Sequence, residues 1–262
     1  MASARVGKFG GIAAQASGPG AAHHAARQDV FSGWGQQPLP DGRVMANSER
    51  RPTPARIRVA GRMLNRLIVR APWAWPAFRG PMRRFFDRSA PGWDGRTGAG
   101  SVEHLAPLAA ALLYVKPAPE RALEVGTGTG AGTLLVAREF PQASVRGVDI
   151  SGEMIRAATG KVGLDPEGRV AFRVADAADL PYNDESFDLV AHLNMPPFVG
   201  EVARVLRPGG HVVVASSWGE ATPFYTPKAV LDWAFAKRGI EPAAAGEAVS
   251  GTYWIGRKPP RG

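Results

Sequence analysis

The stretch Ala122-Leu-Glu-Val-Gly-Thr-Gly-Thr-Gly-Ala-Gly-Thr133 decides the fold of this chain. Apolar residues lead into an acid, Glu124, and a helix-compatible run, 133–138, follows. Between them the turn carries glycines at alternate positions, Gly126, Gly128 and Gly130. Glycine is required there because a Cβ atom would block both positive φ angles and the close approach of a ligand. A strand, a tight glycine turn and a helix N-terminus in this order predict a nucleotide-binding corner.

Two kinds of nucleotide fit this corner. The spacing Gly126-x-Gly128-x-x-Ala131 also satisfies the dinucleotide fingerprint, whose third position accepts alanine. Glu124 distinguishes the two kinds of nucleotide. A dinucleotide presents its pyrophosphate to the turn and gains nothing from a carboxylate there. S-adenosylmethionine carries a sulfonium and an ammonium group, and an acid beside the turn suits that charge. The pattern resembles the first motif of the class I S-adenosylmethionine-dependent methyltransferases, which implies cofactor contacts from Glu124, Gly126, Thr127, Gly128 and Gly130.

The next predicted strand, 143–149, also ends in an acid, Asp149. A carboxylate in this position accepts hydrogen bonds from both ribose hydroxyls, as the resemblance implies. Ser151 follows as the expected N-cap of a helix. Ile150 and Met154 are expected against the adenine ring, with helix core as an equal alternative for Met154.

Further strands follow in the order that this family has. Residues 170–175 lead into Asp176 and Ala177, and the resemblance assigns Asp176 to the adenine amino group. The fourth strand, 186–194, carries Leu193 toward the cofactor, and Arg207–Gly210 is the expected turn before a fifth strand, 211–215. Two closing strands are expected at 240–248 and 251–257. The resemblance covers residues 90–257 and implies an α/β fold: a doubly wound, mostly parallel seven-stranded sheet, Rossmann-like, with an antiparallel C-terminal edge strand.

A second motif narrows the resemblance to one branch of the family. It is the run Phe86-Asp-Arg-Ser-Ala-Pro-Gly-Trp-Asp94. It resembles the "F-D-x-x-A-x-x-Y-D" opening of the small-molecule branch, which includes the ubiquinone and menaquinone C-methyltransferases. Trp93 stands where that branch has tyrosine. The ring is kept and the hydroxyl is lost, so we expect Trp93 to act as an apolar lid over the methionine end of the cofactor.

The sequence indicates less about the residues that bind the methyl acceptor. Asn194-Met-Pro-Pro-Phe198 resembles the Asn-Pro-Pro-aromatic motif of amino-group methyltransferases, but the inserted Met195 breaks that geometry, and a loop with a helix start is the alternative. His192 and Asn194 share a face if the strand alternates regularly, which makes both weak catalytic candidates. A packed structural histidine is the alternative for His192. Phe198 and Tyr225 are expected near the acceptor. Methyl transfer from a sulfonium relies mainly on positioning, so a missing base is no objection.

Composition and charge exclude several classes. The 262 residues include no cysteine, which excludes disulfides, a thiol nucleophile and cysteine-ligated zinc, and we expect no metal site. No membrane span or secretory signal is apparent, so we expect a cytoplasmic protein. Residues 1–90 hold 15 of the 32 Lys and Arg residues but 4 of the 23 Asp and Glu residues, hence +11, which leaves −2 for the remainder. The basic charge therefore lies outside the predicted cofactor domain, which argues against a nucleic-acid substrate.

Three regions are expected along the chain. Residues 1–54 read as a disordered leader, in which His23 and His24 lack partner ligands; a later natural start at Met45 or Met63 would also explain it. Residues 55–89 form a basic amphipathic extension, followed by the methyltransferase domain, 90–262. The extension is either a lid packed on that domain or a membrane-surface helix giving peripheral membrane contact, and we favour the lid.

These observations predict an enzyme that transfers a methyl group from S-adenosylmethionine to a small apolar or aromatic metabolite. The first alternative is a nucleic-acid (rRNA or tRNA) methyltransferase. The second is a cofactor-binding protein without transfer activity that acts through its N-terminal helix. An NAD-dependent oxidoreductase would need a nicotinamide pocket beyond the fourth strand, and the sequence offers none. The acceptor atom and the oligomeric state are left open.

Overall fold

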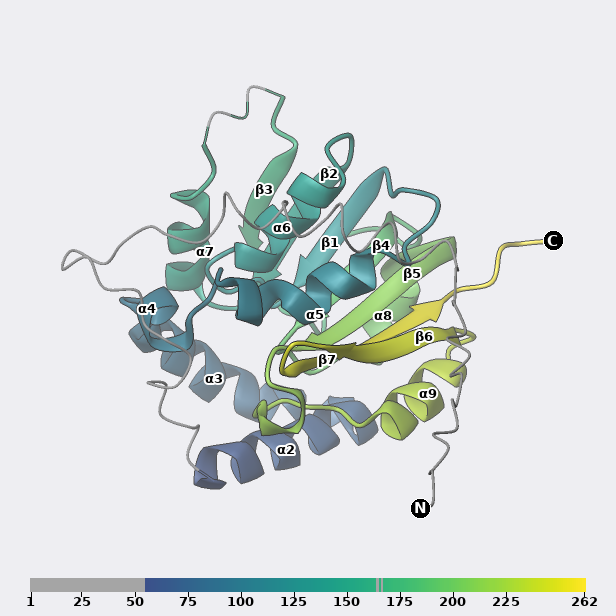
Figure 1. Ribbon diagram of the computed structural model, residues 1–262. Coiled ribbons are helices and arrows are strands. Elements are labelled where there is room, and N and C mark those ends of the chain that lie inside the picture. Colours follow the sequence, from purple (N-terminus) through teal and green to yellow (C-terminus); the bar gives the residue numbers. More distant parts are fainter. Residues whose placement is uncertain (1–54, 164, 166) are drawn as a thin grey trace, which may run out of the picture. The chain divides into compact units, whose positions relative to one another are not determined.

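A computed structural model describes residues 55–163, 165 and 167–262, and in these ranges the chain folds around a seven-stranded sheet. The strand order is β3-β2-β1-β4-β5-β7-β6 (Figure 1). The strands are β1 Arg121–Val125, β2 Ser144–Asp149, β3 Val170–Val174, β4 Phe187–Leu193, β5 Leu206–Ser216, β6 Glu241–Ala248 and β7 Gly251–Arg257. β1 to β5 pair in parallel, whereas β7 is antiparallel to both β5 and β6. The predicted α/β fold with an antiparallel C-terminal strand pair is confirmed.

The site is positioned by the point at which the strand order reverses. β1 lies between β2 and β4, so the connections leaving β1 and β4 run to opposite sides of the sheet. In open α/β sheets this divergence leaves a crevice outside the carboxyl ends of the strands. All seven residues of β4 are buried, as expected for a central strand covered on both faces.

Helices cover both faces of the sheet. They are α5 Val102–Leu112, α6 Ala131–Glu139, α7 Gly152–Thr159, α8 Val199–Val205 and α9 Lys228–Ala236. Figure 1 shows α5 passing in front of the strands and α8 behind them. Ser151 caps α7 as predicted, because its hydroxyl accepts a hydrogen bond from the backbone N–H of Met154 at 3.2 Å.

One predicted boundary is wrong. Arg207–Gly210 was expected to form a turn before the fifth strand, but these residues lie inside β5, which begins at Leu206. The pairing of β4 with β5 shifts register between Phe187 and Leu189, so the two glycines serve an irregular strand. A Cβ atom on Gly210 would lie 2.9 Å from the carbonyl oxygen of Asp188, which explains why glycine is required there.

The N-terminal extension packs against the rest of this unit. It comprises α2 Ala55–Arg70, the 3-10 helix η3 Pro72–Ala74 and α3 Trp75–Ser89, and it leads into α4 Trp93–Thr97. The side-chain Nδ2 of Asn65, on α2, lies within hydrogen-bond distance of the carbonyl oxygens of Phe224 (3.2 Å) and Tyr225 (2.9 Å) and of the hydroxyl of Thr226 (2.8 Å). Asn65 itself is buried. These contacts fasten α2 to the segment 224–226, and the role of the extension as a lid stays a prediction.

Two further observations bear on the predicted regions. No helix within the described ranges is long and apolar enough to cross a membrane. The predictions for residues 1–54, including His23 and His24, lie outside the described residues.

Candidate active site

The glycine turn connects β1 to α6 and has the conformation that its sequence predicts. Gly126, Gly128 and Gly130 have φ angles of 75°, 53° and 89°, which only glycine adopts readily. The backbone N–H groups of Gly126 and Thr127 donate to the carbonyl oxygen of Val148, at 2.8 and 2.9 Å. The turn is therefore fixed against the end of β2. Gly130 is the N-cap of α6, and no side chain caps this helix.

Glu124 lies at the end of β1, 2 % exposed, beneath the glycine turn. Its Oε2 accepts hydrogen bonds from the hydroxyls of Thr127 (2.8 Å) and Thr133 (2.6 Å). A Cβ atom on Gly132 would lie 1.9 Å from Oε1, so the packing around the carboxyl group is tight. Burial raises the pKa of Glu124 to about 7, against the lowering effect of these hydrogen bonds. The group is thus poised to ionise near neutral pH.

Asp149 lies on the other side of the turn, at the end of β2. Its Oδ2 accepts from the backbone N–H of Gly128 at 2.9 Å, and its Oδ1 accepts from the backbone N–H of Ser151 at 2.9 Å. Burial raises the pKa of Asp149, and the two backbone hydrogen bonds oppose that rise. These bonds hold the carboxylate in one orientation while each oxygen keeps a lone pair for a ligand.

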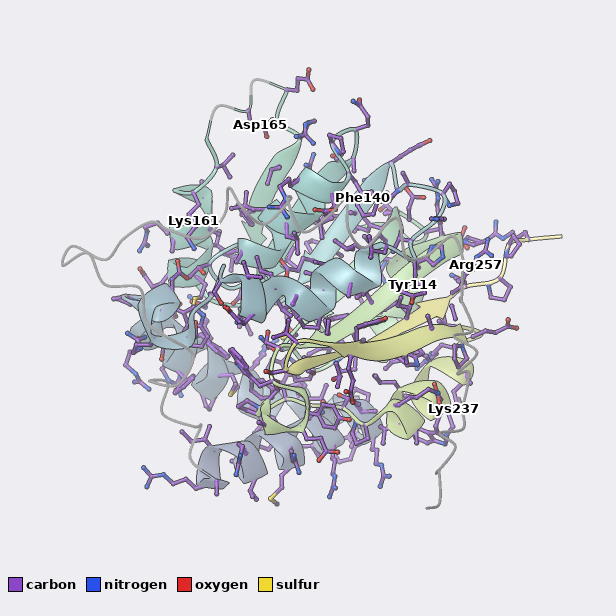
Figure 2. All side chains as sticks on the ribbon, viewed as in Figure 1. Tyr114, Phe140, Lys161, Asp165, Lys237 and Arg257 are labelled. Atoms are coloured by element: carbon purple, nitrogen blue, oxygen red, sulfur yellow. The ribbon has the colours of Figure 1, made fainter. Side chains whose placement is uncertain are left out.

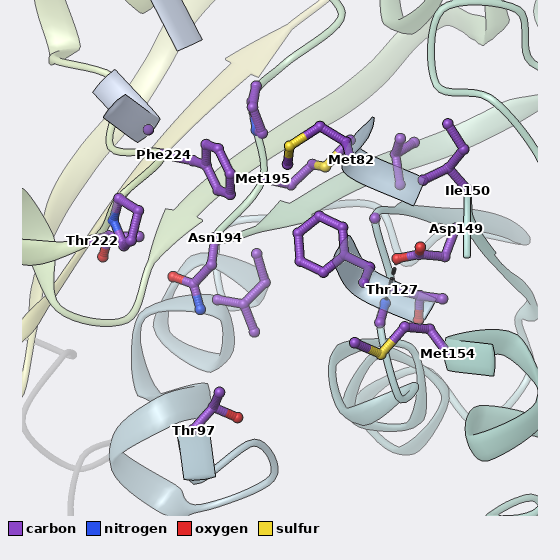
Figure 3. A pocket seen from close by; sticks show the side chains of 18 of the residues that line it. Met82, Thr97, Thr127, Asp149, Ile150, Met154, Asn194, Met195, Thr222 and Phe224 are labelled. Atoms are coloured by element: carbon purple, nitrogen blue, oxygen red, sulfur yellow. Dashed lines mark hydrogen bonds between the residues drawn. The ribbon is translucent and has the colours of Figure 1, made fainter. Parts of the chain in front are cut away.

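A cavity of about 1060 Å³ opens on the turn and on both acids (Figure 3). Most of the predicted cofactor residues line it: Glu124, Gly126, Thr127, Gly128, Asp149, Ile150, Met154, Ala177 and Leu193. In Figure 3, Thr127, Asp149, Ile150 and Met154 lie together, while Asn194, Thr222 and Phe224 lie to the other side. These residues thus lie together at one end of the cavity, and their contacts with the cofactor stay predictions. Gly130 is not among the lining residues. It is the last glycine of the turn and the N-cap of α6.

Asp176 is placed differently from the prediction. It does not line the cavity, although its neighbours Ala175 and Ala177 do. Its Oδ1 accepts from the indole Nε1 of Trp75 at 2.8 Å, and its Oδ2 lies 3.7 Å from Arg79. Both partners belong to α3, so this helix covers the carboxylate that was expected to face the adenine. The role of Asp176 toward the adenine amino group stays a prediction that requires α3 to release it.

The two weak catalytic candidates do not share an environment. β4 ends at Leu193, and Asn194 has a φ of 58°, so the regular alternation of the strand stops there. Leu193 and Asn194 line the cavity, whereas His192 is fully buried outside its lining. Burial lowers the pKa of His192 to about 4, which keeps the ring neutral. His192 therefore has the placement of the packed structural histidine.

The side chain of Asn194 is engaged in structure. Its Nδ2 donates to the hydroxyl of Ser217, and its Oδ1 accepts from the backbone N–H of Ser217, both at 2.8 Å. These bonds join the ends of β4 and β5 at the cavity wall. Asn194 thus positions the wall of the cavity, and its amide is already paired on both sides.

The other residues predicted near the acceptor do not all line the cavity. Trp93 and Phe198 line the cavity as expected, and the ring of Phe198 packs edge-on against Trp75 with centroids 5.2 Å apart. Tyr225 does not line it, because the loop directs Phe224 there instead. Tyr225 lines a separate cavity of about 390 Å³ on another side of α2.

The motif 86–94 anchors the chain over the cofactor end of the cavity. Asp87 accepts from the hydroxyl of Ser151 at 2.6 Å, beside the N-terminus of α7. Asp94 accepts from the hydroxyl of Thr129, in the glycine turn, at 2.5 Å and pairs with Lys161 at 2.5 Å. Lys161, labelled in Figure 2, follows the end of α7. The two acids of the motif thereby fasten α3 and α4 to the loops around the turn.

Sequence reasoning favoured the extension as a lid but did not name the residues that it contributes to the cavity. Leu64, Ile68, Trp75, Met82 and Phe86 all line it, from α2 and α3. The available signal was the apolar stripe of 57–68 and the aromatic cluster that follows it. Met195 was also missed: a Cβ atom on Gly126 would lie 2.5 Å from its sulfur, so this methionine packs directly on the turn.

Comparisons with known proteins agree with this geometry. Residues 123–214 match the family model described as "Methyltransferase domain". A ubiquinone/menaquinone biosynthesis C-methyltransferase UbiE of Geotalea daltonii is 36% identical over 131 residues, which are 46% of this chain and 53% of that protein. A malonyl-[acyl-carrier protein] O-methyltransferase of Methylococcus capsulatus is 36% identical over 145 residues, 52% of this chain and 51% of that protein. The chain thus spans about half the length of these curated relatives.

A solved structure shows the same fold. It is the complex between the Haloferax volcanii Trm112 methyltransferase activator and a methyltransferase, with a TM-score of 0.55 at 22% identity. The match covers 66% of this chain and 97% of that one. At this identity the likeness concerns the fold alone.

Proposed function

Because the chain carries a domain of the class I S-adenosylmethionine-dependent methyltransferases, we propose that it transfers a methyl group from S-adenosylmethionine to a small apolar or aromatic acceptor. The observation that carries this proposal is a pair of acids, the buried Glu124 and the half-buried Asp149. They flank one glycine turn at the ends of neighbouring parallel strands and open on one cavity. A dinucleotide would bring its pyrophosphate to the glycine turn beside the Glu124 carboxyl group, which is electrostatically unfavourable.

The residues present fit this cofactor. Asp149 offers a fixed carboxylate for a ribose, and Glu124 offers a negative charge for a cationic group. Apolar side chains of Ile150, Met154 and Leu193 provide a flat, dry environment for a purine. When bound, S-adenosylmethionine supplies an electrophilic methyl group on a sulfonium sulfur.

The chain's own contribution to the reaction is positioning and exclusion of water. The rings of Trp75, Trp93 and Phe198 and the thioethers of Met82 and Met195 wall the cavity. An apolar enclosure orients the acceptor and strengthens the electrostatic effect of the two acids. A neutral, buried His192 and a fully paired Asn194 leave no general base among the predicted candidates. We therefore propose an acceptor that needs no strong base.

The same walls support a small apolar or aromatic acceptor. The cavity volume of about 1060 Å³ lies at the upper end of the range for ligand sites, which suits a cofactor together with a small acceptor. The named relatives act on a quinone precursor and on malonyl groups carried by a protein, so the family resemblance leaves the acceptor open.

Calorimetric titration with S-adenosylmethionine, S-adenosylhomocysteine and NAD tests the cofactor. The wild type should bind the first two and not NAD, and Asp149→Ala should weaken binding by about 100-fold, the loss of two hydrogen bonds to a charged group. Asp184→Ala is the matched control, because Asp184 is exposed and pairs with Arg204 away from the cavity. Preference for NAD would overturn the assignment.

Transfer itself requires a second measurement. Cell extract supplied with methyl-labelled S-adenosylmethionine and the protein should yield a labelled small molecule. Label recovered in RNA would favour the nucleic-acid alternative. Tight cofactor binding without any labelled product would favour the binding protein without transfer activity.

A further inference from the structure

The charges along the cavity wall are segregated. The acids that line it are Glu124 and Asp149, both at the glycine turn. The arginines that line it are Arg56 and Arg58, in the first turn of α2, and Arg96, in α4. Most of the remaining lining side chains are apolar. The cavity therefore has an acidic end, an apolar body and a basic part supplied by the extension.

The basic part lies at the mouth of the cavity. Ile57 and Phe85 line the cavity and are nevertheless 47% and 50% exposed, so they mark where it meets solvent. Arg56 and Arg58 flank Ile57 in sequence, and Arg58 is half-buried. Arg96 is committed elsewhere, because it donates to the carbonyl oxygens of Pro91 (2.6 Å) and Ser89.

The first turn of α2 breaks a general rule of helix electrostatics. The N-terminus of a helix carries partial positive charge and favours acids, but this turn has no acid and two arginines. Within the described ranges no hydrogen bond or ion pair to Arg56 or Arg58 is found. The acid of the two extension helices, Asp87, is bound to Ser151. Two cations in the first turn of this helix thus line the cavity without a counter-charge from the described chain.

We propose that this turn binds an anionic group of the acceptor, so that the acceptor is an amphipathic acid: an apolar body with a carboxylate, sulfate or phosphate at one end. A half-buried guanidinium is stabilised by an anion, to which it donates two parallel hydrogen bonds. The arginines would hold the anion at the mouth, whereas Glu124 and Asp149, the acids that would hold the cofactor, lie at the glycine turn. The atom that is methylated therefore belongs to the other end of the acceptor and is not the anionic group itself. This inference rests on the proposed function.

A matched pair of probes tests the inference: decanoate and its neutral methyl ester. Each is titrated calorimetrically into the free protein and into the protein saturated with S-adenosylhomocysteine. The wild type should bind decanoate about 10-fold or more tightly than the ester, the gain expected from hydrogen bonds to a charged group. Arg58→Gln should remove this preference, and Arg58→Lys should keep part of it. Arg88→Gln is the control, since Arg88 is exposed on α3 and does not line the cavity.

The outcomes separate the inference from the proposed function. Equal binding of acid and ester, or a preference that survives Arg58→Gln, overturns the inference while cofactor binding and methyl transfer stand. Failure to bind S-adenosylhomocysteine overturns the proposed function, and the titrations of the free protein still decide whether the mouth selects an acid. A preference lost equally in Arg88→Gln would reflect overall charge and also overturns the inference.

Discussion

Acidification below pH 7 should weaken cofactor binding through Glu124. In the free protein the pKa of this carboxyl is about 7, because burial disfavours its charged form. A cationic ligand beside the group favours the charged form, so binding lowers its pKa and releases a proton. The affinity for the cofactor should therefore be constant above pH 7 and should fall as the pH decreases below 7. The cationic ligand must then compete with a proton for Glu124.

The magnitude follows from the pKa. Each pH unit below 7 costs about 1.4 kcal/mol, or about tenfold in affinity, until the pKa of the complex is reached. From pH 7.5 to pH 5.5 the dissociation constant of S-adenosylmethionine should therefore rise about 30-fold. About one proton should be released per cofactor bound near pH 6. The α-amino group of the ligand, with a pKa of about 8, is protonated below pH 7 and begins to lose its charge only toward pH 7.5.

Calorimetry at pH 5.5, 6.5 and 7.5, in two buffers of different ionisation enthalpy, gives both quantities. Glu124→Gln is the control: the amide keeps the size of the side chain and an oxygen for Thr127 and Thr133, but it cannot titrate. Its affinity should be weaker at pH 7.5 and independent of pH. A wild-type affinity that is flat across this range would refute the reasoning. An equal pH dependence in Glu124→Gln would assign the proton to another group, and Asp149, whose pKa burial also raises, would be next in line.

Three further predictions concern the packing around the site. Gly132→Ala should lower the free energy of unfolding by about 1–3 kcal/mol in urea titration, because the new Cβ would lie 1.9 Å from Glu124; an unchanged midpoint would contradict the tight packing. Trp75→Phe should lower it by about 1.5–3 kcal/mol, the loss of one hydrogen bond to the Asp176 carboxylate, and the same change in an Asp176→Asn background should cost clearly less. If the extension contacts membranes, Trp73→Ser, which changes an 80% exposed indole, should reduce sedimentation with anionic vesicles; no binding by the wild type would end that alternative.

The cofactor end of the site was predictable because its signals are local. The glycine turn and Glu124 lie within a few residues of one another, and Asp149 ends the next strand of a parallel sheet. Parallel neighbouring strands bring their carboxyl ends together whatever the rest of the chain does. The positions of such residues relative to one another can therefore be predicted from the sequence alone.

The surroundings of Asp176 and of His192 were not predictable, because long-range contacts and the end of a strand determine them. Trp75 bonds to a residue 101 positions away, and that bond decides which way Asp176 faces. The alternation that paired His192 with Asn194 fails because the strand ends between them, at a residue with positive φ. A period-two pattern gives no sign of where a strand stops, so it placed His192 beside Asn194 at the cavity wall, whereas Asn194 and Leu193 line the cavity and His192 does not.

The amide of Asn65 couples two segments that are 159 to 161 residues apart in sequence. One segment is α2. The other is the stretch from Phe224 to Thr226, which continues the run of cavity-lining residues that ends at Phe224. Because this side chain is buried, separating the two segments would leave its Nδ2 group unpaired, at a cost of about 1–3 kcal/mol. We therefore expect α2 and the segment 224–226 to move together when the cavity widens for a large ligand.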